Sequence, residues 1–301
     1  MASLSSVRWC SGFPVRACST SISSSPPGSG RSPGSIACRT LRTLPSRIWP
    51  VTGQACPTTS FSPPTTRPSS PGLSCRAEEL SPLDFVEFIL DEAPLSAAGA
   101  AYHYSDTGYL LLGMVIEKAT GRAYYDLVRE AFLEPLALRH TSPSNMRDLP
   151  GLATGYFDDD FTRALLGSDT TRLDSGLLAF NPVVEWTGGG FATTAQDLAS
   201  WGSALYRGHA MPGTYVDDLI GPGVGALVVG ESTYHLGQGI RRTPQGLVYG
   251  HNGWIPGYVS YFAYYPEYEF SIAAQFNTTT ASSSDHGPVP LAKERLLAAV
   301  I

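Results

Sequence analysis

Two stretches of the chain carry side chains that can move protons and hold a polar ligand. In Tyr104-Ser105-Asp106 a loop sets a phenol beside a carboxylate, just before an apolar run that begins at Tyr109. In the second stretch the imidazole of His251 stands among turn and strand residues. A free phenol has a pKa of about 10, so Tyr104 acts as a base at neutral pH only where cations favour the phenolate. A single histidine in a loop is by itself more typical of a structural role, so the chemistry depends on what surrounds the two side chains.

These stretches and a third one resemble the conserved boxes of a known superfamily. Tyr104-Ser105-Asp106 and the helix after it resemble the Tyr-x-Asn box of the serine β-lactamases and penicillin-binding DD-peptidases, in a class C-like version. Gly188 to Leu198 resembles the family's Gly-Gly-x-x-Ser-Thr-x-x-Asp-Leu segment. His251-Asn252-Gly253 resembles its Lys-Thr-Gly or His-x-Gly box on an edge strand. The three follow one another in family order between Leu80 and Asn277.

The resemblance implies a role for each matched residue. The catalytic residues would be Tyr104 and His251, the phenol relaying a proton between the nucleophile and the leaving group. The substrate-binding residues would be Asp106, Asn252, Gly253 and Trp254. A glycine lets the substrate backbone approach the strand, and the backbone N–H of Trp254 would supply half of an oxyanion hole. No cofactor and no metal is implied.

The family's nucleophile motif is absent from these 301 residues. In the family the attacking serine belongs to Ser-x-x-Lys at the start of a buried helix, where the lysine lies one turn away and acts on the serine proton. This chain has two lysines, Lys118 and Lys293, and Val115 and Pro290 stand three residues before them. Without that lysine we expect Tyr104 to be an ordinary phenol and the chain to form no acyl-enzyme.

Asp106 departs from the asparagine that is commoner in the family. An amide donates a hydrogen bond to a substrate carbonyl, whereas a carboxylate only accepts. Asp106 therefore suits an ammonium group or a substrate N–H. This argues against tight β-lactam recognition and leaves esterase or carboxypeptidase-like activity open.

Residues 1–76 differ in composition from the rest of the chain. They contain no Asp, Glu or Lys, are dense in Ser and Pro, and hold all five cysteines. The cysteine spacings fit neither a zinc site nor a secreted disulfide framework. Three interpretations compete: a transit peptide of a plastid-targeted enzyme, a disordered segment, or a segment translated out of register.

We favour a wrong reading frame for residues 1–76. The codons allowed for Arg47 to Ser60, read two bases later, permit His-Leu-Ala-Ser-His-x-Ser-Gly-Leu-Pro-Asp-Tyr-Phe. The same shift over Arg16 to Ile22 permits Gly-Leu-Leu-Asp-Leu-Asp. Both phrases resemble family sequence that follows the nucleophile helix, which would put the missing Ser-x-x-Lys at or just upstream of Met1. Residues 77–301 then form a partial domain.

Composition excludes several classes of partner. The net charge of −6 argues against nucleic acid and anionic membranes. No apolar run has the length of a membrane span, and the N-terminus shows no secretory signal peptide, although members of the resembled family are often exported. Asp158-Asp159-Asp160 has no His or Glu at ligand spacing, so we interpret it as a solvated acidic run rather than a metal site. We expect a small-molecule or peptide substrate, and the sequence assigns no compartment.

The pattern of elements predicts an α/β (α+β) fold. Apolar periodicity and capping residues predict helices, which are Ser81–Leu90, Tyr109–Gly121, Ala123–Leu133, a helix from Thr194 to Gly208, and Pro290–Val300. Aromatic and β-branched runs predict an antiparallel meander of strands, which are Tyr234–Arg241, Leu247–Tyr249, Tyr258–Tyr265 and Phe270–Phe276. The stretch from Ser142 to Gly189 is expected to be loop-rich. The resemblance implies helices flanking the sheet and a helical lobe, with the N-terminal strands and the nucleophile helix missing.

The function that the resemblance implies is that of a β-lactamase-related serine hydrolase. The intact parent would acylate its serine with an ester, amide or lactam carbonyl and then hydrolyse the acyl-enzyme. This chain, which lacks the first box, is expected to be inactive. The alternative is a non-catalytic binding module for peptide or peptidoglycan-like ligands.

Overall fold

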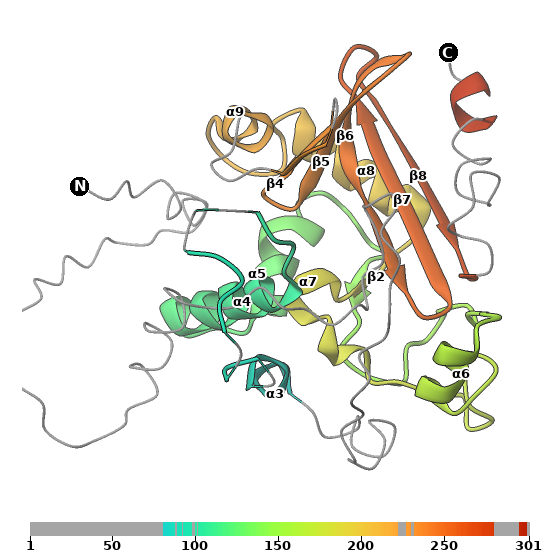
Figure 1. Cartoon of the computed structure of the whole chain (residues 1–301). Helices are drawn as coiled ribbons and strands as arrows, with labels where there is room; N and C mark the ends of the chain where they lie inside the picture. Colours follow the sequence, from blue (N-terminus) through green and yellow to red (C-terminus); the bar gives the residue numbers. More distant parts are fainter. Residues whose placement is uncertain are drawn as a thin grey trace, which may run out of the picture.

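A computed structural model describes residues 81–87, 89–91, 93–97, 100, 102–221, 227–229, 232–279 and 295–299. The segment 1–76 lies outside these residues, as does most of the closing helix expected over Pro290–Val300, of which 295–299 are helical. The described chain forms a six-stranded antiparallel sheet that follows a group of helices (Figure 1). This is the antiparallel sheet with flanking helices and a helical lobe that the sequence predicts.

The sheet is a meander in which each strand pairs with the next one along the chain. Its strands are β3 (Leu227–Val229), β4 (Ser232–His235), β5 (Gln238–Thr243), β6 (Gly246–Ile255), β7 (Tyr258–Tyr265) and β8 (Phe270–Phe276). Short turns join them, which only antiparallel neighbours allow. In the described part of the chain, β8 has no strand partner on the side away from β7.

The structure confirms two predicted strands, β7 and β8, to the residue. The prediction of one strand over Tyr234–Arg241 was wrong, because Leu236 and Gly237 turn the chain with φ of 50° and 78° and separate β4 from β5. The strand predicted at Leu247–Tyr249 is longer and runs to Ile255. His251 therefore lies inside a strand and not in a loop.

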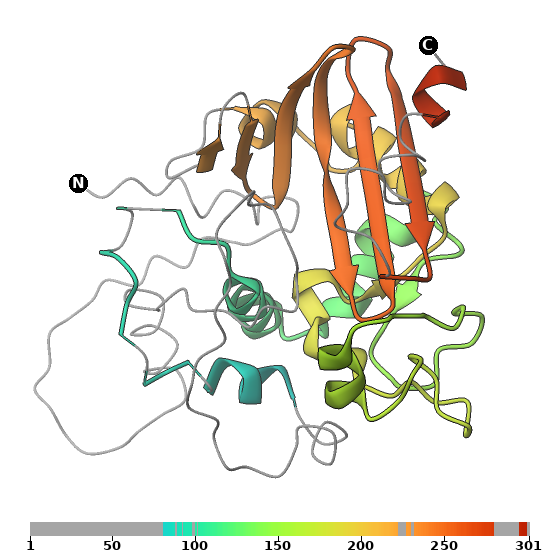
Figure 2. The ribbon, with the colours of Figure 1, turned by 45° about the vertical axis from the view of Figure 1, so that its right-hand side comes forward.

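Side chains alternate along the strands and fill a separate core on each face of the sheet. One core lies under α8 (Ala195–Tyr206) and α9 (Tyr215–Ile220), and Figure 2 shows α8 behind the sheet. Its buried members are Tyr206, Leu219, Tyr249, Phe262 and Tyr264. The other core is covered by the helical residues 295–299, and its buried members are Val248, Tyr261, Ala263, Tyr265, Ile272 and Leu297. Gly202 allows the close approach of α8, since a Cβ there would overlap the ring of Phe262.

The helices that precede the sheet share a third core. They are α3 (Pro82–Glu87), α4 (Asp106–Thr120), α5 (Tyr124–Val128) and α7 (Trp186–Gly189). The buried members of this core are Val86, Leu110, Leu111 and Trp186. α4 is the longest of these helices, so it forms the axis against which the others pack (Figure 1).

α4 ends at Gly121 as predicted, with a φ of 68° that glycine adopts without strain. Its start was predicted less well. The helix was predicted from Tyr109, whereas it begins at Asp106, and the Ser105 hydroxyl oxygen caps it by accepting a hydrogen bond from the Gly108 N–H at 3.0 Å. Ser105 has extended backbone angles, as a capping residue must, while Asp106 already belongs to the first turn.

The helix predicted over Ala123–Leu133 is present, but its second half is of another type. α5 continues into the π-helical turn η2 (Arg129–Leu133), in which the Glu134 N–H donates to the Arg129 carbonyl at 2.9 Å. Such a turn inserts an extra residue into the helical repeat. Pro135 follows and ends the helix as expected.

The stretch expected to be loop-rich contains short elements that its patterning did not reveal. These are β1 (Ser142–Pro143), α6 (Asp160–Leu166), η3 (Pro182–Val184) and α7, and β1 pairs with β2 (Phe191–Ala192). Asp159 caps α6 by accepting from the Thr162 N–H at 2.7 Å, and Asp160 pairs with Arg163 at 2.7 Å. The exposed acidic run therefore begins a helix.

Two findings concern classes of site across the described ranges. No group of three or more His, Cys, Asp or Glu side chains there is placed to hold a metal ion. No helix there combines the length and the apolar character needed to cross a bilayer.

A buried carboxylate joins α8 to the loop after η2. Thr194 caps α8 as predicted, since its hydroxyl oxygen accepts from the Asp197 N–H at 3.3 Å. The Asp197 carboxylate, 6% exposed, accepts from the His140 N–H at 2.7 Å and from the Thr141 hydroxyl at 3.0 Å. This carboxylate therefore satisfies two donors from a segment more than fifty residues away.

We expect Asp197→Asn to lower the free energy of unfolding by about 1.5–3 kcal/mol, because an amide replaces a charged acceptor of two buried hydrogen bonds. Urea denaturation of the full chain measures this change. Asp218→Asn, at an exposed position on α9, is the matched control and should change stability by less than about 0.5 kcal/mol. Equal effects of the two substitutions would contradict this role of Asp197.

Candidate active site

The first predicted site stretch lies at the start of α4. Tyr104 precedes the Ser105 cap and Asp106 opens the helix, so the cap fixes the backbone that carries both side chains. Both residues are partly buried. Thr187 of α7 donates from its hydroxyl to the Tyr109 carbonyl at 2.6 Å and holds α7 against this end of α4.

The second stretch lies on a part of β6 that is paired on one side. Pairing with β5 ends at Gly239 opposite Gly250, whereas pairing with β7 continues to Ile255 opposite Tyr258. His251 to Ile255 therefore form an edge strand, which is the setting that the resemblance implies. Gly250 is required at the end of the paired part, because a Cβ there would overlap the Phe262 carbonyl oxygen of β7.

Tyr234 of β4 lies between the two predicted catalytic residues. Its hydroxyl is 2.7 Å from His251 Nε2, and its ring centroid is 5.8 Å from that of Tyr104. Tyr102 packs edge-on against the same ring at 5.7 Å. The structure thus brings Tyr104 and His251 into contact with the same phenol, which the sequence did not single out.

His251 is neutral at neutral pH. Burial lowers the pKa of its imidazole, and the charge of Arg241 acts in the same direction. A hydrogen bond with the backbone of Asn252 and the charge of Asp106 oppose this shift without outweighing it. His251 therefore does not supply a fixed positive charge to a ligand.

The substrate-binding residues predicted on β6 occupy successive positions beyond His251. Asn252 is exposed and lies opposite Tyr261, and Trp254 is partly buried opposite Val259. Gly253 lies opposite Ser260, and a Cβ at this glycine would overlap the Ser260 hydroxyl. A larger residue at position 253 would therefore require the Ser260 hydroxyl to rotate away.

A second carboxyl group, Glu185, lies beside Asp106. A Cβ built on Gly188 would be 3.8 Å from both Asp106 Oδ1 and Glu185 Oε2, so the two carboxyl groups flank the same glycine turn. Burial, and then the charge of Asp106, raise the pKa of Glu185 to about 7. The sequence analysis missed this residue, and its only local signal is a position three residues before the glycine run.

Comparison with protein families agrees with this arrangement of boxes. The family model described as Beta-lactamase matches residues 58–295, which include every residue discussed at the site. The chain belongs to the β-lactamase family. The match begins inside the segment 1–76.

The curated relatives of this β-lactamase-family chain are longer than the part it matches. It is 29% identical over 188 residues to "Penicillin-binding protein 4*" of Bacillus subtilis (strain 168), covering 58% of this chain and 40% of that protein. It is 28% identical over 111 residues to the human mitochondrial "Serine beta-lactamase-like protein LACTB", covering 37% of this chain and 18% of that one.

Similar solved structures also have chains longer than the part that this chain covers. The D-stereospecific amidohydrolase from Streptomyces sp. has a TM-score of 0.58 and 26% identity, with 68% of this chain and 59% of that one covered. The D-amino acid amidase from Ochrobactrum anthropi SV3, complexed with L-phenylalanine amide, has a TM-score of 0.58 and 23% identity, with 73% and 63% covered. This chain thus spans less than two thirds of each relative.

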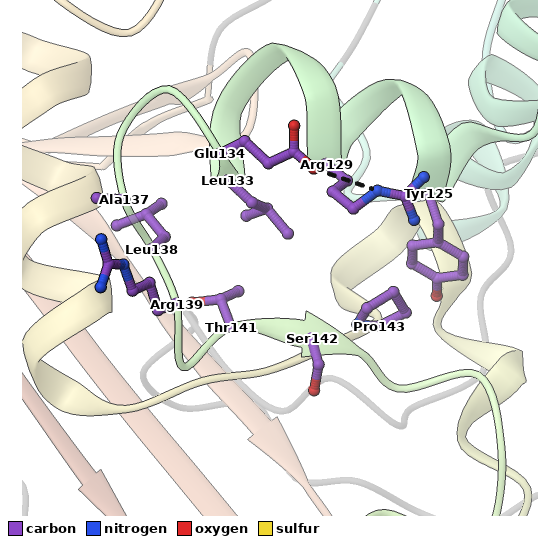
Figure 3. Close-up of a pocket in the computed structure, with 10 residues that line it drawn as sticks. All are labelled: Tyr125, Arg129, Leu133, Glu134, Ala137, Leu138, Arg139, Thr141, Ser142 and Pro143. Carbon is purple, nitrogen blue, oxygen red and sulfur yellow. Dashed lines mark ion pairs between the residues drawn. The ribbon is translucent and has the colours of Figure 1, made fainter.

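A cavity of about 490 Å³ lies in the helical part and is distinct from the residues above. It is lined by residues from α5, η2 and the loop that leads to β1, which are Tyr125, Arg129, Leu133, Glu134, Ala137, Leu138, Arg139, Thr141, Ser142 and Pro143 (Figure 3). None of the predicted site residues lines it. The Tyr125 hydroxyl donates to the Gly190 carbonyl at 3.0 Å, so the cavity wall also supports the glycine turn.

We expect the stability of the protein to fall as the pH rises from about 4.5 to about 7, in part because of Glu185. Its folded pKa is raised, so the folded state binds more protons than the unfolded state in that window. Glu185→Gln should remove this part of the fall, roughly 2–3 kcal/mol. Urea unfolding across that pH range measures it, with Glu87→Gln on the exposed surface of α3 as the control. An unchanged pH dependence in Glu185→Gln would mean that this carboxyl group titrates normally.

Proposed function

We propose that this chain is part of a β-lactamase-related serine hydrolase, in which it carries the ligand-binding half of the catalytic centre, and that the 301-residue polypeptide is inactive because it lacks Ser-x-x-Lys. The observation that carries this proposal is the meeting of the α4 start with the β6 edge around Tyr234. No Ser-x-x-Lys accompanies them in the sequence. The intact parent would hydrolyse an ester, amide or lactam through its acylated serine.

In this proposal the site residues have the roles that the family resemblance implies for them. Tyr104 and His251 belong to the catalytic half of the parent centre, and the backbone N–H of Trp254 would polarise the ligand carbonyl. Asn252 and Gly253 would contact the ligand along the β6 edge, where no strand of the described residues pairs with β6 beyond the end of β5. The ligand is then a small molecule or short peptide that lies along this strand.

The charges at the site favour a ligand with an amine or amide N–H over one with a carboxylate. Asp106 and Glu185 both present carboxyl oxygens around Gly188, and His251 carries no positive charge at neutral pH. A carboxylate ligand would be repelled by Asp106, while an ammonium group would be attracted. The D-amino acid amidase has been solved with L-phenylalanine amide and with L- and D-phenylalanine, so it supports amino acid derivatives as ligands to test, while the preference for the amide rests on the charges at this site.

A non-catalytic binding module for peptide or peptidoglycan-like ligands is the second candidate. The buried cores on both faces of the sheet favour it, because they indicate a fold that can close without the nucleophile helix. A monodisperse product that unfolds cooperatively and binds a D-phenylalanine amide would support this role. Aggregation through exposed apolar surface would support a truncated enzyme instead.

We also propose that residues 1–76 are translated out of frame. The support is the genetic-code compatibility of Arg47–Ser60 and Arg16–Ile22 with family sequence. The nucleotide sequence from about a hundred bases before Met1 to Arg76 tests it. An open frame that encodes the Ser/Pro/Arg-rich segment without interruption, found intact in the natural protein by mass spectrometry, would overturn it.

We expect no stoichiometric burst when the purified chain is mixed with a p-nitrophenyl ester or a fluorescent penicillin, because it lacks an activated serine. Rapid-mixing absorbance and in-gel fluorescence measure the burst, with an intact family member as the positive control. Ser105→Asn is the matched variant. Asparagine can also cap a helix, and the substitution removes the serine hydroxyl that stands between Tyr104 and Asp106. A burst in the wild-type 301-residue chain would contradict the proposed inactivity, and its loss in Ser105→Asn would identify Ser105 as the nucleophile.

A further inference from the structure

Tyr234 occupies the space between two residues that come from distant parts of the chain. Tyr104 belongs to the loop before α4 and His251 to the edge of β6, and both contact Tyr234. The hydroxyl reaches His251 Nε2 at 2.7 Å, within ordinary hydrogen-bond distance. A phenol that touches both groups can determine how they lie relative to each other.

The β4–β5 hairpin places the Tyr234 ring there through two glycines. Tyr234 lies opposite Gly239, which in turn lies opposite Gly250, so no side chain stands between β4 and β6 in that row. The Tyr234 ring carbon Cδ2 lies 4.0 Å from the position that a Cβ on Gly239 would occupy. At the hairpin tip a Cβ on Gly237 would be 2.7 Å from the Tyr109 hydroxyl, so α4 supports the tip as well.

We propose that Tyr234 is a positioning residue of this centre, which holds the His251 imidazole through Nε2 and fixes its orientation toward Tyr104. This inference rests on the proposed function only in so far as Tyr104 and His251 belong to a ligand site. The contact between Tyr234 and His251 is a separate physical claim that can be tested without any ligand.

The 2.7 Å contact between the Tyr234 hydroxyl and His251 Nε2 fits either direction of the hydrogen bond, and we assign Tyr234 as its donor. Burial raises the pKa of the Tyr234 phenol, and the neighbouring Tyr104, Tyr109 and Tyr102 raise it further. Burial lowers the pKa of the His251 imidazole. With Tyr234 as the donor to Nε2, the ring proton of His251 is on Nδ1, and the Tyr234 oxygen is left to accept the hydrogen bond that joins it to Tyr104.

This arrangement limits what His251 can offer a ligand. In this arrangement Nε2 accepts from Tyr234 and the hydrogen bond with the Asn252 backbone engages the one ring proton, so the imidazole has no donor left for a ligand carboxylate. Tyr234 thus disfavours carboxylate ligands by engaging His251, in addition to the repulsion of such ligands by the charge of Asp106. The ligand class expected is an amide or ester in which the carboxyl group is masked.

The experiment is a long-range ¹H–¹⁵N correlation spectrum of the ¹⁵N-labelled full chain. The ring signals of His251 are assigned as those that disappear in His251→Gln. We expect the wild type to show His251 as the Nδ1–H tautomer alone. In Tyr234→Phe, the lost donor should produce a mixture of the two tautomers. Tyr102→Phe is the matched control, since it removes a phenol that contacts the same ring at 5.7 Å, and it should leave the His251 signals unchanged.

Two results would overturn the inference: a wild-type His251 with its proton on Nε2, or a Tyr234→Phe spectrum identical to that of the wild type. The wild-type measurement decides the first even if the variant fails to fold.

Titration with D-phenylalanine amide and D-phenylalanine then tests the consequence for ligands. The amide should bind the wild type more tightly, and Tyr234→Phe should narrow the difference. If neither ligand binds while the tautomer result holds, the proposed function fails and the positioning role of Tyr234 stands.

Discussion

The pairing of β6 with β7 is the constraint on which the rest of this structure depends. Its register runs from Tyr249 opposite Tyr264 to Ile255 opposite Tyr258, well past the point at which β5 stops. The same register places aromatic residues of β7 in the two cores, so that a slip by one residue would move each of them to the other face. Because the cores fix the register, they also fix which residues of β6 form the open edge.

The second constraint is the fit between α4 and the elements around its first turn. Gly113 allows α7 to pack so closely on α4 that a Cβ there would overlap Thr187. The hydrogen bond from Thr187 to the Tyr109 carbonyl then sets the position of the glycine turn beside Asp106. The carboxyl group of Glu185 comes to Asp106 as a result of this packing, and their proximity is an electrostatic cost that the surrounding hydrophobic contacts offset.

Family membership and activity are different conclusions for this chain. The family model covers most of its length, and the TM-scores of 0.58 to an amidohydrolase and an amidase agree with the fold. The relatives are longer, and the family's nucleophile motif is absent from this sequence. Under the proposed function, this chain carries the part of the centre that receives a carbonyl compound, and its 301 residues do not include the Ser-x-x-Lys motif that would attack it. Its chemistry is therefore best studied through binding and protonation states.

The sequence by itself determined the family resemblance, the order of the boxes and the absence of Ser-x-x-Lys, because these depend on residue types at fixed local spacings. It also determined β7, β8 and the end of α4 at Gly121, where alternation or a glycine acts over a few neighbouring residues. The cap at Ser105, the turn at Leu236 and the length of β6 were missed, since several local patterns fit the same residues there.

Only the tertiary structure decided the surroundings of the site. Tyr234 and Glu185 come from segments 130 and 81 residues away from Tyr104, and no local pattern connects them to it. Their proximity arises from the β4–β5 hairpin on α4 and from α7 on α4. The protonation of His251 was likewise undetermined by the sequence, because the pKa of a buried group depends on desolvation and on charges that the chain gathers only when it folds.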